Sequence, residues 1–252
     1  MRLRVAARKA PFLGAFFIWG LLAAAAAPAE VVRVKEVVDG DTVVLHDGRS
    51  VRLIGINAPE TGKHGVAPEP YADEARQRLA ALARGREARL SYGRQREDHY
   101  GRTLAYVDVG THDAGADLLA AGLASAIAVP PNLERLQAYG AAEAQARSAR
   151  KGIWGHRYGQ PLAADGLGAA DTGYHFVRGR VLRVGESRRN VFLDLAEGFS
   201  VMIAHADWDE YFSGRPQQWQ GRAIVARGWV TSGDGKLRMR VQHPAMIETA
   251  VH

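Results

Sequence analysis

The feature that most constrains the fold is a series of short β-forming runs at residues 31–56, separated by tight-turn pairs. Val, Leu and Ile dominate these runs, which are interrupted at Asp39-Gly40-Asp41 and again at Asp47-Gly48. Asp-Gly flanked by β-branched residues is a strong hairpin signal, because both residues tolerate the positive φ that a tight turn requires. The chain is therefore expected to start its folded part with antiparallel hairpins.

Helical patterns follow in the same half of the chain. Segments 71–84, 114–121 and 132–151 place apolar residues on one helical face, and a glycine follows each of them. Residues 88–94 and 102–109 read as further strands. Strands first, with helices among and after them, predict an α+β domain whose sheet is a small barrel.

The second half of the chain predicts a separate β-rich unit. Residues 158–172 are rich in Gly, Ala and Asp and read as a linker. Residues 173–252 then give three strands, a short helix and two strands, the order of a five-stranded Greek-key OB-fold barrel. We therefore expect a first domain at 30–157 and a C-terminal OB-like β domain after the linker.

The N-terminus has the pattern of a secretory signal peptide. Residues 1–10 are positive, residues 11–27 are apolar, and Ala27-Pro28-Ala29 is a small-x-small cleavage site. We expect cleavage after Ala29 and a periplasmic or secreted mature protein with no membrane span. The alternative is an uncleaved anchor, since the apolar run is near the lower limit for spanning a bilayer.

Charge and cysteine content narrow the function classes. Four of the 33 basic residues and none of the acidic ones lie within 1–29, so the remaining chain is close to neutral. Net charge is therefore no argument for nucleic-acid binding. The absence of cysteine excludes disulfides, a thiolate nucleophile and Cys-based zinc sites.

Chemistry-bearing residues of the first domain gather in four turn-like segments, 39–42, 52–61, 98–102 and 152–155. Taken one at a time, each is open to a structural interpretation as a turn, a loop cap or a surface charge. Considered together, the order and spacing of the four segments favour a functional site over four unrelated turns.

These segments resemble the thermonuclease family, whose namesake is staphylococcal nuclease. The resemblance spans about residues 31–155 and includes VDGDT at 38–42, VRLIGINAPET at 51–61, YGRTLAY at 100–106 and GIW at 152–154. It implies an OB-fold barrel with packed helices. It also implies calcium-dependent hydrolysis of phosphodiester bonds in DNA and RNA.

The resemblance assigns roles to the matching positions. Arg52 and Arg102 match the two catalytic arginines, and Glu60 matches the carboxylate that activates the attacking water. Guanidinium forks suit this task because they pair with phosphate oxygens and stay charged. A nearby carboxylate can take the proton of the water. Tyr100, beside the arginine motif, is the candidate contact for substrate.

The implied calcium site departs from the family pattern. Asp41 matches the principal calcium carboxylate, and Ala58 would lend its backbone carbonyl. Asn57 stands where the family usually has a second Asp, which removes a negative charge and predicts weak calcium binding. Segment 126–131 also lacks the tyrosines that contact substrate in the namesake.

Two functions therefore remain open. The first is an exported, calcium-dependent nuclease, acting on DNA or RNA, with an accessory C-terminal barrel. The second is a catalytically degenerate OB-fold protein that binds nucleic acid or an envelope partner, which Asn57 favours. The oligomeric state stays open.

Arginines of the C-terminal domain alternate with apolar residues, as in Arg238-Met239-Arg240-Val241. In a strand this spacing puts the arginines on one face, which is either a binding stripe or a solvated outer face. Trp208, Trp219 and Trp229 are expected in the core.

Overall fold

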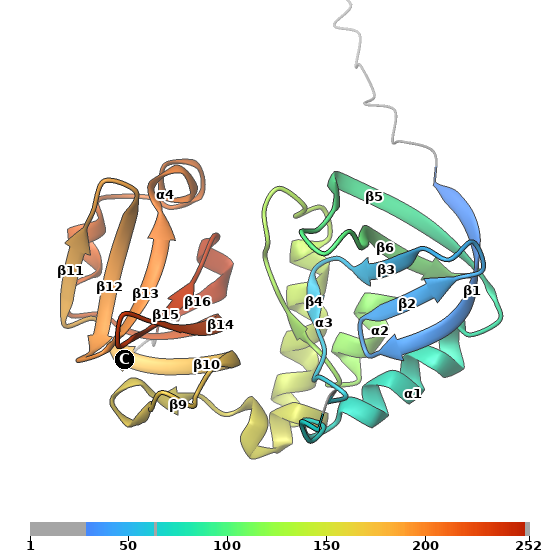
Figure 1. Ribbon diagram of the computed structural model, residues 1–252, viewed down its shortest axis with the longest axis horizontal. Coiled ribbons are helices and arrows are strands. Elements are labelled where there is room, and N and C mark those ends of the chain that lie inside the picture. The colour runs from blue at the N-terminus through green and yellow to red at the C-terminus, as the bar shows by residue number, and fades with distance from the viewer. Residues whose placement is uncertain (1–28, 63–64, 250–252) are drawn as a thin grey trace, which may run out of the picture.

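The computed structural model describes residues 29–62 and 65–249, so the expected signal peptide lies outside the described residues except for Ala29. These residues form two lobes side by side, joined by the segment around β9 (Leu162–Ala163) (Figure 1). The first lobe is a barrel with helices, and the second is a curved sheet with one helix.

Five strands of the first lobe close into a barrel. The order is β3-β2-β1-β5-β6, and a parallel pairing of β3 with β6 closes the ring. Their bounds are β1 Glu30–Asp39, β2 Thr42–Leu45, β3 Ser50–Leu53, β5 Glu87–Glu97 and β6 Thr103–Val109, with β7 (His112–Asp113) beside β6. The expected α+β fold with a barrel sheet is confirmed.

Three helices pack against this barrel: α1 (Ala72–Ala83), α2 (Ala114–Ala120) and α3 (Leu136–Ser148). Helix α1 buries Ala72, Ala75, Leu79 and Ala83, the single apolar face that the helical period predicts. It ends before Gly85, whose φ of 74° is the left-handed conformation that glycine adopts without strain.

Helix α3 starts later than the sequence predicts. The expected helical segment begins at Asn132, but the Asn132 side chain bonds to the backbone of Gln95 on β5. Arg135 takes the N-cap position, and the helix begins at Leu136. The expected start was wrong because an Asn side chain serves a distant strand as readily as a helix end.

The second lobe contains an open sheet. Its order is β11-β12-β13-β15-β14-β10-β9, with β16 paired to β14. The bounds are β10 Gly173–Arg180, β11 Arg183–Glu186, β12 Asn190–Ala196, β13 Phe199–Ala204, β14 Ala223–Gly233, β15 Lys236–Arg240 and β16 Ile247–Thr249, with α4 at His205–Tyr211. Three short 3-10 helices follow α3 and two lie in the second lobe: η1 Gly152–Gly155, η2 Arg157–Gly159, η3 Ala164–Gly166, η4 Pro216–Trp219 and η5 Pro244–Met246.

The strand order of this sheet agrees with the Greek-key expectation, but its closure does not. Strand β13 runs parallel to β15, and β10 pairs with β14. Among the described residues no pairing joins the end strands, so the expected closed second barrel is corrected to an open sheet. The first strand expected for this unit is interrupted at residues 181–182, between β10 and β11. There the Val181 N–H donates to the Arg222 carbonyl and the Leu182 N–H donates to the Asp194 carbonyl.

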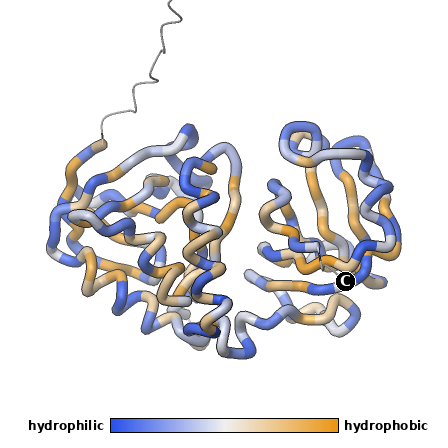
Figure 2. The backbone as a smooth tube through the Cα atoms, turned by 180° about the vertical axis from the view of Figure 1, so that it is seen from behind, coloured by the Kyte–Doolittle hydropathy of each residue, from blue (hydrophilic) through white to orange (hydrophobic). Residues whose placement is uncertain are grey.

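The two lobes share hydrophobic packing. One core fills the first barrel, and the second core joins the sheet of the second lobe to Ile127, Ala146, Ile153 and Trp154 of the first. The Trp154 and Phe176 rings meet edge-on at 5.3 Å. Figure 2 shows hydrophobic stretches along the strands of both lobes, with hydrophilic residues more frequent in the connections.

Candidate active site

Asp41 lies in the turn between β1 and β2 and is only 4% exposed. Its backbone N–H donates to Asp39 Oδ1 at 3.1 Å, which fixes the turn. Gly40 brings this turn against its neighbours: a Cβ at Gly40 would lie 2.5 Å from the Ala58 Cβ and 2.6 Å from the Ala75 Cβ. Gly40 is therefore needed here because its neighbours approach too closely for a Cβ, whereas its φ lies outside the left-handed region.

Arg52, on β3, reaches into the same place. Its Nη2 lies 2.9 Å from Asp41 Oδ2 and donates to Asn57 Oδ1 at 3.3 Å. Its Nη1 donates to the backbone carbonyls of Leu53 and Ile56, at 2.8 and 2.9 Å. These four contacts hold the guanidinium of Arg52, a residue only 9% exposed, in one orientation.

The charge of Asp41 is costly in this position. Burial raises the pKa of its carboxyl to about 7, although the neighbouring Arg52 charge works in the opposite direction. Asp39, which is also buried, raises the pKa further by like-charge repulsion. A second cation beside Asp41 would favour its charged form.

Asn57 and Ala58 come at the end of the short strand β4 (Ile56–Asn57), and both are buried. The Ala58 N–H donates to Asp41 Oδ2 at 2.9 Å. Strand β4 pairs with β8 (Ser125–Ala126), with Asn57 opposite Ser125. The position of the Asn57-Ala58 backbone therefore depends on β8.

Strand β8 is fixed from both lobes. Ser125 Oγ donates to the Tyr174 hydroxyl oxygen at 3.0 Å and lies 3.4 Å from the Asn57 carbonyl oxygen. The Ala126 N–H donates to Glu143 Oε1, and its carbonyl accepts from Arg227 Nη1. Tyr174 and Arg227 belong to the second lobe, so both lobes determine the geometry of the site.

Arg102 immediately precedes β6, the strand paired in parallel with the one that carries Arg52. Its Nε donates to Asp98 Oδ2 at 2.7 Å. Partial burial opposes the charge of Asp98, but hydrogen bonds from Arg102 and its positive charge hold the pKa of Asp98 below its usual value. The Tyr100 ring, in a residue 73% exposed, lies 5.4 Å from the Arg102 guanidinium.

Glu60 follows Asn57 and Ala58 by a few residues and is exposed. Its backbone is fixed by Glu69: the Glu60 N–H donates to Glu69 Oε2, and the Glu69 N–H donates to the Glu60 carbonyl. Glu69 also accepts from the Tyr158 hydroxyl at 2.7 Å. Burial raises the pKa of Tyr158, and the charges of Glu69 and Glu60 add to this, so Tyr158 lies near both carboxylates.

The structure thus joins Asp41, Arg52, Asn57 and Ala58 in one hydrogen-bonded group, which we call the Asp41 cluster. Arg102 is on the neighbouring strand. Glu60 is on the segment just after β4. In the ranges that the structure describes, no hydrogen bond or ion pair links Arg102 to the cluster.

Sequence reasoning missed several residues that shape the site. Asp39 adjoins Asp41 in a motif already noticed, so it could have been found. Ser125, Glu69, Tyr158 and Tyr174 carry no motif. Their partners are distant in the chain, and no local pattern indicates them.

Two side chains of the Asp41 cluster offer oxygen atoms as metal ligands, the carboxylate of Asp41 and the amide of Asn57. Oxygen donors suit a hard cation such as Ca²⁺. Within residues 29–62 and 65–249 there is no group of three or more His, Cys, Asp or Glu side chains that could hold a metal. The side chains therefore offer the type of atom that calcium prefers, but only one of them, Asp41, carries a negative charge.

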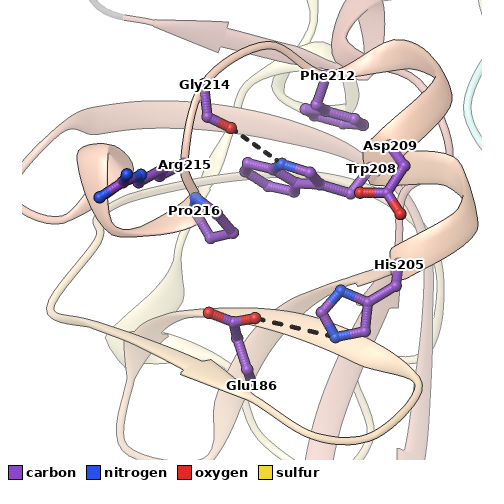
Figure 3. Close-up of a pocket in the computed structure, with 8 residues that line it drawn as sticks. All are labelled: Glu186, His205, Trp208, Asp209, Phe212, Gly214, Arg215 and Pro216. Atoms are coloured by element: carbon purple, nitrogen blue, oxygen red, sulfur yellow. Dashed lines mark hydrogen bonds and ion pairs between the residues drawn. The ribbon is translucent and has the colours of Figure 1, made fainter.

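A pocket of about 340 Å³ lies in the second lobe, away from the Asp41 cluster (Figure 3). Trp208 and Phe212 stack at 4.9 Å beside it, and the indole of Trp208 donates to the Gly214 carbonyl. On the opposite side, His205 Nε2 lies 3.9 Å from Glu186 Oε2. The pocket is lined by both acidic and basic side chains beside the aromatic pair, so its lining does not indicate one class of ligand.

Comparison with known proteins agrees with this geometry. Residues 50–156 match the model of the family described as staphylococcal nuclease homologue. The chain is 36% identical over 128 residues to the thermonuclease of Staphylococcus hyicus, covering 50% of this chain and 76% of that protein. It is 38% identical over 124 residues to the thermonuclease of Staphylococcus intermedius, covering 48% and 74%.

The fold and the cluster define a nuclease-like barrel of the α+β class. The chain belongs to the staphylococcal nuclease family, as its sequence motifs indicate. The family match begins at Ser50, so Asp41 lies before it and is connected to it through Arg52. In the described part of the chain, no helix is long and apolar enough to cross a membrane.

Proposed function

We propose that this protein is an exported, calcium-dependent nuclease that hydrolyses phosphodiester bonds of DNA or RNA. The observation that carries the proposal is the Asp41 cluster: a buried carboxylate, a fixed guanidinium and the amide oxygen of Asn57 meet at one point, where the Ala58 N–H also donates to Asp41. Membership of a family with thermonuclease relatives supports the same chemistry.

The arginines would supply electrostatic stabilisation. Phosphodiester cleavage gathers negative charge on the phosphoryl oxygens, and positioned guanidinium groups stabilise that charge. Both terminal nitrogens of Arg52 are held by protein oxygens, so Arg52 would act through its fixed positive charge and would contact a phosphate through Nε or by releasing Asp41 or Asn57. Arg102 is held through Nε by Asp98, which leaves its terminal nitrogens for phosphate.

Glu60 and Tyr100 would act at the exposed side of the site. Glu60 is exposed on a backbone fixed by Glu69, so its carboxylate would accept the proton of the attacking water. The exposed Tyr100 ring offers a stacking surface next to Arg102.

Asp41, the amide oxygen of Asn57 and the carbonyl of Ala58 would hold calcium. When bound, the ion would neutralise phosphate charge and favour the charged form of Asp41, whose pKa is about 7 without it. With one carboxylate in the set, we expect a weak site, with a Kd of roughly 10⁻⁴–10⁻³ M.

We also propose that residues 1–29 direct export and are removed after Ala29. The positive, apolar and small-residue regions of the N-terminus support this. N-terminal sequencing of protein recovered from the periplasm or the medium tests the proposal. A chain that still begins at Met1 in a membrane fraction would overturn it.

Cleavage assays test the nuclease itself. Plasmid, single-stranded DNA and RNA are incubated with millimolar calcium or with chelator, and product is followed on gels. We expect cleavage only with calcium and loss of cleavage in Arg52→Ala. Persistent cleavage in Arg52→Ala would show that the assigned mechanism is wrong.

One observation favours a second function, nucleic-acid binding without cleavage. Asn57 replaces a carboxylate and gives its oxygen to Arg52 rather than leaving it for a metal. In that case calcium produces no cleavage in the natural protein, while Asn57→Asp restores it. The same assay therefore separates the two functions.

A further inference from the structure

The second lobe presents an outer sheet face that the proposed reaction does not use. Strand alternation places the core residues on the inner side and leaves the other side chains outward. Cross-strand register brings Trp229 and Thr231 of β14 next to the arginines of β15. The outward residues across the sheet include Tyr174, Phe176, Arg227, Trp229, Thr231, Arg238, Arg240, Ser200, Met202, Phe192 and Asp194, whose carboxylate accepts from Ser200 Oγ.

One end of this outer face is covered by the first lobe. Tyr174 bonds to Ser125, and Phe176 packs against Trp154. Arg227 forms a buried ion pair with Glu143 at 2.8 Å. The face therefore begins at the back of the Asp41 cluster and continues outward along β14 and β15.

Trp229 stands at the border of the covered part. It was expected in the core, but it is 41% exposed, which corrects that expectation. Its ring meets Tyr174 edge-on at 5.0 Å, so the indole is supported on one side and open on the other. Through Tyr174 and Ser125 it is only two side chains from the Asn57 carbonyl.

The arginines beside Trp229 are weakly paired. Arg238 Nη1 lies 3.8 Å from Asp234, whose side chain is almost fully exposed. Arg240 Nη2 lies 3.9 Å from Asp207. Neither distance allows a hydrogen bond of normal strength, so both guanidinium groups are available to another anion.

We propose that the outer face of β14 and β15 binds single-stranded nucleic acid extending from the candidate active site. Trp229 would stack on a base, and Arg238 and Arg240 would contact phosphates. A base can stack on a side chain only when it is unstacked from its neighbours, which selects single strands over duplexes. This inference rests on the proposed function, since it names the form of the substrate.

Binding without cleavage tests the inference. The full chain is titrated into a 5′-fluorescein-labelled oligo-dT of about 12 nucleotides with chelator present, and anisotropy is recorded. We expect Trp229→Ala to weaken binding about ten-fold or more and Trp229→Phe to retain most of it. An oligo-rU of the same length and a DNA duplex are measured in parallel; we expect the duplex to bind more weakly.

The arginines are tested through salt dependence, on variants whose changes lie at the surface. Each phosphate contact on a single strand contributes about 0.7 to the slope of log Kd against log salt. Arg238→Ala/Arg240→Ala should therefore lower that slope by about 1.4. The matched control is Arg86→Ala, an exposed arginine of the first lobe, which should leave the slope unchanged.

The outcomes separate this inference from the nuclease proposal. Unchanged oligonucleotide affinity in both Trp229→Ala and the double arginine variant, with each variant folded by circular dichroism, would overturn the binding surface even if cleavage proceeds. Loss of affinity in these variants supports the surface even if no calcium-dependent cleavage is found. Equal affinity for duplex and single strand would overturn the preference for single strands.

Discussion

Arg227 of the second lobe neutralises Glu143 of the first: both Glu143 carboxylate oxygens accept from Arg227 Nη1 at 2.8 Å. Glu143 is 4% exposed, and it also accepts from the backbone of Ala126 on β8. A carboxylate so deeply buried needs its counter-charge. A residue of the second lobe therefore supplies the close counter-charge of a buried acid in the lobe that carries the candidate site.

Arg227→Met should destabilise the protein by about 3–5 kcal/mol, because the buried Glu143 charge loses its close counter-ion and keeps only Arg147, whose Nη1 lies 4.0 Å away. Urea unfolding of the full chain measures this change. Glu143→Gln/Arg227→Met should recover part of the loss, since a neutral amide needs no counter-charge.

The control for this prediction is Arg78→Met, which breaks the exposed pair of Arg78 with Asp117. Exposed pairs contribute about 0–1 kcal/mol, so this variant should stay close to wild type. If Arg227→Met is no worse than Arg78→Met, then the buried pair does not hold the lobes together.

Asp41 should make the metal-free protein less stable as pH rises. Its folded pKa of about 7 is above its ordinary value of 3.8, so the folded state binds more protons than the unfolded state between these values. The stabilisation is present at low pH and is lost as pH rises through about 7. Asp41→Asn removes this dependence.

Urea unfolding of wild type and Asp41→Asn in chelator, at pH 5 and pH 8, measures this pH dependence of stability. At pH 5, Asp41→Asn should already be more stable than wild type by about 1.7 kcal/mol, because the unfolded chain has released most of the Asp41 proton while the folded protein still holds it. At pH 8 the variant should be more stable than wild type, by at most roughly 4 kcal/mol. A variant that is equally destabilised at both pH values would contradict the prediction.

Asn57→Asp should strengthen calcium binding by an order of magnitude or more. A second carboxylate beside Asp41 raises the ligand charge, and calcium affinity follows that charge. Calorimetric titration of calcium into the two proteins gives the comparison. Asn57→Ser, which removes the amide without adding charge, is the control and should not tighten binding.

Arg102 and its partner Asp98 should differ in their effects on cleavage. Arg102→Lys loses the planar fork and should reduce kcat by about 10³-fold, by analogy with other catalytic arginines. Asp98→Asn keeps the guanidinium but weakens its anchor, so a smaller loss is expected. Single-turnover cleavage at saturating calcium measures both, and equal losses would mean that Asp98 does more than hold Arg102.

Local chemistry made much of the fold predictable. The Asp-Gly turns of the first hairpins and the apolar face of α1 need only neighbouring residues to be recognised, and both form as expected. Asn132 shows where this stops, because its side chain bonds to Gln95, 37 residues away in the chain. Trp229 was misjudged because apolarity says nothing about which side of a sheet is covered.

The candidate site divides in the same way. The family resemblance pointed to Asp41, Arg52, Asn57 and Ala58, and the structure joins them. The contributions of Tyr174 and Arg227 could not be predicted, because nothing local distinguishes these residues from other tyrosines and arginines of the second lobe. Only the packing of the two lobes selects them.

The buried Glu143 also limits how this protein can be shortened. A version cut back to the family-matched residues 50–156 would keep the buried Glu143 without Arg227, with only Arg147 at 4.0 Å, and would uncover apolar residues such as Trp154. Shortening the chain would therefore require replacing Glu143 and the apolar residues that the second lobe covers. The second lobe is thus a structural part of the folded protein and not an independent appendage.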